Sequence, residues 1–136
     1  MEDAMRPIWP VLVPYILIVA RLCLAAVFLF SGFDKARHWG DGVREVAGLG
    51  LPLPPVFTAL TIATQLLGGL MIVFNVGAWI GAGLLAAFTV IATVLGHRFW
   101  LSHGARAKRE LTTSLEHLAI VGGLLLLAAQ SLGAFH

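Results

Sequence analysis

Three ionisable side chains in or beside long apolar runs could carry chemistry. Arg21 stands in the apolar run RLCLAAVFLFSGFDK, which Lys35 closes. A guanidinium at the centre of a membrane span costs about 2.5–3.5 kcal/mol even on the lower scales, so we expect Arg21 to face a bundle interior and to have a partner there. His97 and His117 titrate near neutral pH and could accept or deliver a proton.

Uncharged polar residues follow single helix faces in the same runs. Thr89, Thr93 and His97 recur every four residues, which places them on one face of a helix. Arg21 and Gln65 are both expected near the middle of their spans, where they could meet. The candidate ligand-binding residues are Arg21, Gln65, Thr89, Thr93, His97 and His117.

Each of these residues also has a purely structural interpretation. The threonines could donate only to carbonyls of their own helix, which is the commoner fate of threonine in membrane helices. Gln65 could form an interhelical hydrogen bond that only stabilises the bundle. His97 and His117 could lie at the membrane surface and pair with Glu116 or a lipid phosphate. For Arg21 a purely structural role is hardest to justify, because packing alone does not offset the free-energy cost of a charged side chain in the membrane.

The composition indicates which elements must hold these residues. Of the 136 residues, 59% are hydrophobic and 12% are charged, which is too little polar surface for a water-soluble globule. We therefore expect an all-α integral membrane protein, a transmembrane four-helix bundle that forms one domain over 1–136. Its spans, each near the about 20 residues that cross a bilayer, are expected at 11–33, 55–74, 77–97 and 114–135. Segment 38–49 is either a short interfacial helix or an ordered loop.

Small residues predict how these helices pack. The third run carries Gly77 and Gly81 four residues apart, and the fourth run carries Gly122 and Gly123. Small side chains let helix backbones approach closely in lipid, so these positions favour a compact bundle. The same glycines could instead mediate dimerisation.

Cations gather on one side of the four-span arrangement. That side holds Lys35, Arg37, Arg44, Arg98, Arg106, Lys108 and Arg109. The other side holds only Arg6, so both termini are expected outside the cytoplasm. We interpret Lys35, Arg44, Arg106, Lys108 and Arg109 as topology or interface residues that meet anionic lipid or a soluble protein. Because these cations lie beside apolar runs, their distribution does not indicate nucleic-acid binding.

The order of several short motifs resembles that of the DoxX family of small bacterial and archaeal membrane proteins. Arg21 precedes FLFSGFDK at 28–35, and GLGLPLP at 48–54 precedes the second span. QLLGGL at 65–70 and LAIVGGLLLL at 118–127 complete the resemblance, which covers about residues 18–130. The family pattern usually has a glutamate where Gln65 stands and a Lys-Asn pair where Glu116 and His117 stand. A neutral Gln65 is no counterion for Arg21, which would need Glu116, a ligand's anionic oxygen or a hydrated cavity.

The resemblance implies a redox setting in the bacterial cytoplasmic membrane. Some DoxX relatives belong to a thiosulfate:quinone oxidoreductase or to an oxidative-stress complex, whereas many have no known activity. Our leading hypothesis is a quinone-facing subunit, in which Arg21, Gln65 and His97 or His117 donate to a quinone carbonyl. The sequence shows no flavin, nicotinamide or iron–sulfur signature, and we expect no metal site. The chain would therefore not be catalytic alone and would need a redox partner.

Three alternatives come from other classes. A non-catalytic accessory or anchoring subunit of a larger membrane complex would explain the glycines and the basic loops without chemistry. A b-type haem between His97 and His117 is disfavoured, because both residues lie close to the interface. A small transporter or proton pathway is disfavoured, because the expected spans lack the buried carboxylate that such a pathway normally uses.

Overall fold

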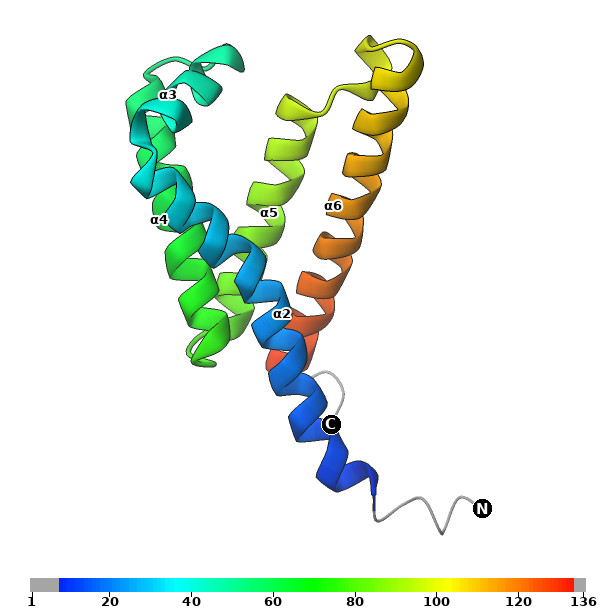
Figure 1. Ribbon diagram of the computed structural model, residues 1–136. Coiled ribbons are helices and arrows are strands. Elements are labelled where there is room, and N and C mark those ends of the chain that lie inside the picture. Colours follow the sequence, from blue (N-terminus) through cyan, green and yellow to red (C-terminus); the bar gives the residue numbers. More distant parts are fainter. Residues whose placement is uncertain (1–7, 134–136) are drawn as a thin grey trace.

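The computed structural model describes residues 8–133 of the chain. The regular elements in that range are all helical, and they are α2 (Trp9–Arg37), α3 (Trp39–Gly48), α4 (Pro54–Val73), α5 (Ala78–Gly96), the short 3₁₀ helix η1 (Phe99–Leu101) and α6 (Gly104–Ser131) (Figure 1). The four long helices α2, α4, α5 and α6 are long and apolar enough to cross a membrane. The expected all-α fold with four candidate spans is confirmed.

Two helices, α2 and α6, extend beyond the expected apolar runs into segments where the sequence turns polar. α6 begins at Gly104, ten residues before the run that starts at 114. Alanine, lysine, arginine and glutamate fill its first two turns, and all four are strong helix formers. Segment 38–49 is a helix, α3, rather than a loop. Its position on a membrane surface stays a prediction.

The bundle is two helix pairs that open away from each other. α2 packs on α4 and α6 packs on α5, while α4 and α5 join the pairs as a hairpin. In Figure 1 the pairs diverge toward the end that carries α3 and η1, which we call the loop end. We call the opposite end, which carries the α4–α5 turn, the closed end. α2 contacts α6 only sparsely, so the expected compact bundle is compact at one end only.

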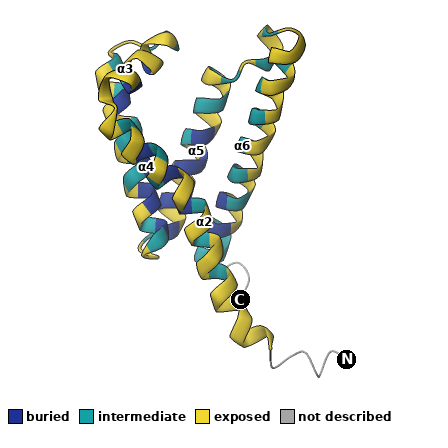
Figure 2. Cartoon of the chain, in the orientation of Figure 1, coloured by how far each residue is buried: buried dark blue, intermediate teal, exposed yellow. Residues whose placement is uncertain are grey.

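Glycines set the closest helix contacts, which agrees with the sequence prediction for Gly81 and Gly123 but not for Gly122, where an added Cβ would meet nothing within 4 Å. A Cβ on Gly81 would lie 2.9 Å from the carbonyl oxygen of Gly68, and a Cβ on Gly69 would lie 2.7 Å from Leu29 Cδ2. The buried apolar core is contributed by all four long helices (Figure 2). Its members are Ala25, Phe28, Ile72, Ala82, Leu85, Ala86, Leu124 and Leu127.

Candidate functional site

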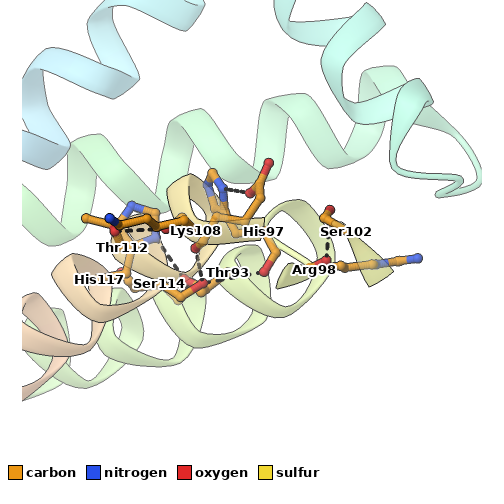
Figure 3. A network of polar contacts seen from close by, with 10 residues as sticks. Thr93, His97, Arg98, Ser102, Lys108, Thr112, Ser114 and His117 are labelled. Atoms are coloured by element: carbon orange, nitrogen blue, oxygen red, sulfur yellow. Dashed lines mark hydrogen bonds and ion pairs between the residues drawn. The ribbon is translucent and has the colours of Figure 1, made fainter. Parts of the chain in front are cut away.

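A cluster of polar side chains bridges α5 and α6 near the loop end (Figure 3). Thr93 and His97 come from the last turn of α5 and the residue that follows it. Glu110, Ser114 and His117 stand on α6 at positions i, i+4 and i+7, which share one helix face. The two faces meet through Thr93 with His117 and through His97 with Glu110.

The contacts of Thr93 determine which nitrogen of His117 carries the proton. Thr93 Oγ1 donates to the carbonyl oxygen of Thr89 at 2.6 Å, which uses its single hydroxyl proton. His117 Nδ1 lies 2.9 Å from the same oxygen and must therefore donate to it. In a neutral imidazole this leaves Nε2 of His117 as an acceptor.

Glu110 holds His97 in the same way. His97 Nδ1 lies 2.7 Å from Glu110 Oε2, and a carboxylate oxygen accepts from the ring N–H. The two side chains are 33% and 21% exposed, so the pair is partly shielded from solvent. A carboxylate on Nδ1 fixes the orientation of the ring and presents Nε2 to a reaction partner.

The two imidazole rings touch each other. Their centroids lie 5.2 Å apart with an interplanar angle of 70°, an edge-to-face contact. Each ring is therefore fixed twice, by an oxygen partner on Nδ1 and by the other ring. Together they make a preorganised pair of groups able to accept or deliver protons.

Glu110 connects this cluster to an open cavity at the loop end. The cavity has a volume of about 530 Å³ and lies between the end of α3 and the α5–η1–α6 connection. Glu110 belongs to its lining and also bonds His97, so it stands between the cavity and the histidine pair.

Gln65 belongs to a second cluster, between α2 and α4. Its Nε2 donates to Ser31 Oγ at 3.2 Å, and Lys35 Nζ donates to the same oxygen at 2.9 Å. Gln65 is only 4% exposed, and its Oε1 has no hydrogen-bond partner among the described residues. The amide thus joins two helices, as its structural interpretation holds.

Arg21 lies far from Gln65, so the expected contact between them is not formed. Gly69 faces both the Leu29 side chain and the Ala25 carbonyl, and Arg21 lies four residues before Ala25, about 6 Å toward the closed end. α4 ends at Val73, also about 6 Å beyond Gly69, so Arg21 lies near the level at which α4 ends. Arg21 forms no ion pair with any residue in 8–133.

The remaining candidates divide between structural and surface positions. Thr89 Oγ1 donates to the carbonyl of Leu85 in its own helix and has no further partner in the described range, which is the contact that its structural interpretation expects. Arg44 pairs with Asp41 on exposed α3. Arg106 lines the cavity, whereas Lys108 and Arg109 are exposed on the first turns of α6.

Sequence reasoning missed Glu110 and Ser114. It offered Glu116 or a lipid phosphate as the partner of the histidines, yet Glu116 is exposed and forms no ion pair within the described part of the chain. The available signal was the spacing of Glu110, Ser114 and His117, which follows one face of α6 if the helix begins before residue 110. The expected start at 114 hid that face.

Comparisons with known proteins identify the family. The DoxX family model matches residues 16–98. The inner membrane protein YphA of Escherichia coli is 26% identical over 121 residues, which cover 89% of this chain and 86% of that protein. The Surfeit locus protein 4 homolog of Drosophila melanogaster is 31% identical over 117 residues, which cover 83% of this chain but only 40% of that protein. No solved structure matches the chain. With four apolar helices and a family match over most of its length, the chain is an integral membrane protein that belongs to the DoxX family.

Proposed function

We propose that this protein is a quinone-facing membrane subunit of a redox complex in the bacterial inner membrane. The observation that carries the proposal is the histidine pair between α5 and α6. Both His97 and His117 have an oxygen partner on Nδ1, which leaves both Nε2 atoms for a ligand. The location rests on the resemblance to an inner membrane protein of Escherichia coli.

The chemistry of these residues suits a quinone. A bound quinone supplies two-electron redox chemistry in which protons join or leave its ring oxygens. His117 Nε2 can accept a proton from such an oxygen or return one, because Thr93 holds the ring in a fixed tautomer. Glu110 orients His97 and borders the open cavity, so protons can pass between the pair and the loop end.

The proposed ligand site differs from the site expected from the sequence. Thr93, His97 and His117 remain in it, and Glu110 joins them. Arg21 and Gln65 do not, because Arg21 lies toward the closed end and Gln65 bonds Ser31 on the other helix pair. Haem fits this arrangement poorly, since two rings in edge-to-face contact leave no space for a porphyrin between them. The electrons must come from a separate redox partner, because the chain carries no electron-transfer motif of its own.

Anaerobic binding of a short-chain quinol, whose hydroxyls can donate to the Nε2 acceptors of His97 and His117, to the purified full-length protein tests this proposal. Quenching of tryptophan fluorescence gives the affinity. We expect His97→Ala and His117→Ala to weaken binding about tenfold each, the effect of about one lost hydrogen bond. His38→Ala is the matched control, because His38 is an exposed histidine at the loop end that pairs with Asp34 instead. Equal affinity in all four proteins, or no binding to the unmodified chain, would contradict the proposal.

One observation favours a second candidate function, an accessory subunit that packs against a larger membrane complex. The segment Trp9–Ala20 of α2 precedes Arg21 and therefore extends past the end of α4 at the closed end (Figure 1). Its large apolar side chains are exposed, among them Val11, Ile16 and Val19. A photo-crosslinker at Ile16 should then capture a stoichiometric partner, whereas one at exposed Phe30 should not.

A further inference from the structure

Two open cavities lie at the loop end, and their linings carry opposite charge. The larger one, of about 530 Å³, has the charged residues Arg98, Arg106 and Glu110 in its wall. The smaller one, of about 310 Å³, is lined by three acids and one lysine. Those four residues are Asp34, Lys35, Asp41 and Glu45. The larger cavity alone has an excess of permanent positive charge.

The two arginines of the larger cavity, Arg98 and Arg106, have no ion-pair partner among the residues that the structure describes. Glu110, the one carboxylate in the wall, has Oε2 engaged by His97 Nδ1 at 2.7 Å. Ser102 also lines the cavity, and its hydroxyl donates a long hydrogen bond of 3.4 Å to the Arg98 carbonyl.

Apart from His103, the rest of the wall consists of glycine and leucine from the end of α3 and from the α5–η1–α6 connection. Leu49 follows α3, Leu95 belongs to α5 and Leu101 ends η1. The volume falls within the range of about 300–1,000 Å³ typical of small-molecule sites. A cationic edge beside an apolar wall, at the polar end of membrane-spanning helices, suits a group that is anionic on one side and apolar on the other.

We propose that this cavity binds a phosphate group between Arg98 and Arg106. A guanidinium presents a planar fork of N–H donors that matches two phosphate oxygens, and a phosphate has enough acceptor oxygens for two forks. The group can belong to the headgroup of an anionic phospholipid or to free phosphate. This site goes beyond the proposed quinone chemistry and does not depend on it, since it uses neither His97 nor His117 as a ligand.

Native mass spectrometry of the full chain in neutral detergent, with added phosphatidylglycerol, tests the site. We expect Arg98→Ala and Arg106→Ala to weaken retention of a single lipid roughly tenfold or more, as loss of one charged hydrogen bond requires. Arg109→Ala is the matched control. It removes the same charge from the same end of α6, but Arg109 does not line the cavity, so retention should change less than twofold.

Two further additives identify the source of the phosphate. Displacement of the lipid by millimolar inorganic phosphate assigns the site to free phosphate, whereas retention of the lipid assigns it to the headgroup. Oleate shares the apolar chain and the negative charge but lacks phosphate. Oleate binding as tight as that of phosphatidylglycerol would overturn the phosphate assignment.

The control variant also exposes the main competing explanation. If Arg109→Ala weakens binding as much as Arg106→Ala, the lipid is attracted by the whole basic surface and the proposed site is wrong. Unchanged binding in an Arg98→Ala, Arg106→Ala double variant overturns it as well. Should the alanine variants fail to fold, Arg98→Lys and Arg106→Lys keep the charge, lose the fork and should still bind several-fold more weakly. A thermal midpoint of the unmodified protein that phosphatidylglycerol does not raise would also count against the site.

Discussion

His97 Nδ1 lies 2.7 Å from Glu110 Oε2, a bond that ties the end of α5 to the second turn of α6 across thirteen residues of sequence. The buried residues of α6, Leu124 and Leu127, both lie toward its other end. At the loop end, α5 and α6 are therefore joined by polar contacts rather than by a buried apolar core.

Glu110→Gln should loosen this end of the bundle. The change removes the charge from a partly shielded hydrogen bond, so we expect a loss of about 1–2 kcal/mol in the free energy of unfolding. Glu116→Gln removes the same charge six residues away at an exposed position and should stay within about 0.5 kcal/mol of the unmodified protein. Unfolding monitored by circular dichroism in detergent measures both. Equal effects of the two variants would show that the His97 contact contributes nothing.

Thr93→Val should release the proton of His117 from Nδ1. Valine has the shape of threonine but cannot accept from the ring, so His117 should become a mixture of its two neutral tautomers. Nitrogen NMR of histidine-labelled protein reports this directly through the shifts of Nδ1 and Nε2. Thr89→Val is the control, because Thr89 donates only to the Leu85 carbonyl of its own helix. An unchanged His117 spectrum in Thr93→Val would contradict the assigned donor and acceptor roles.

The sequence predicted the elements better than their relative positions. Long apolar runs located α2, α4, α5 and α6, because hydrocarbon solvent demands such runs whatever the packing. The level of Arg21 could not be predicted in this way. It depends on the axial register of α2 against α4. The contact between Leu29 and Gly69 fixes that register, and no periodic pattern in the sequence predicts this contact.

The candidate site was predicted in part for a related reason. Thr93 and His97 share a face of α5 whose spacing is plain in the sequence, and their convergence with His117 followed from the topology. Glu110 was hidden because polar residues end an apolar run without ending the helix. Hydropathy marks where lipid contact stops, whereas helix propensity carried α6 back to Gly104.

Gly81→Ala should separate the two helix pairs where they cross. A Cβ there would lie 2.9 Å from the Gly68 carbonyl oxygen and 3.0 Å from Met71 Cβ, so backbone must move. We expect a cost of about 1–3 kcal/mol in unfolding free energy. Gly83 stands on the same helix with nothing within 4 Å of an added Cβ, so Gly83→Ala should be neutral or up to about 1 kcal/mol stabilising through helix propensity. Similar results for the two variants would mean that α4 and α5 are farther apart at Gly68 and Gly81 than the structure shows.

Gln65→Glu tests whether Lys35, rather than Arg21, is the counterion of an acidic side chain at position 65. Lys35 Nζ and Gln65 Nε2 both donate to Ser31 Oγ, at 2.9 Å and 3.2 Å, so a carboxylate at 65 would lie next to the Lys35 ammonium. In the unmodified background the variant should cost less than about 1 kcal/mol, because the new charge gains a partner. In a Lys35→Met background the same change leaves a buried charge unpaired and should cost about 3 kcal/mol or more.

A double-mutant cycle on unfolding free energies measures that difference as one coupling term between positions 35 and 65. The matching cycle with Arg21→Met is the control, since Arg21 lies about 15 Å from the level of Ser31 along α2. Coupling to Lys35 and none to Arg21 would assign Lys35 as the partner of any acid at this position. The reverse result would restore a contact between Arg21 and position 65, and would require α2 to sit about ten residues out of its present register on α4.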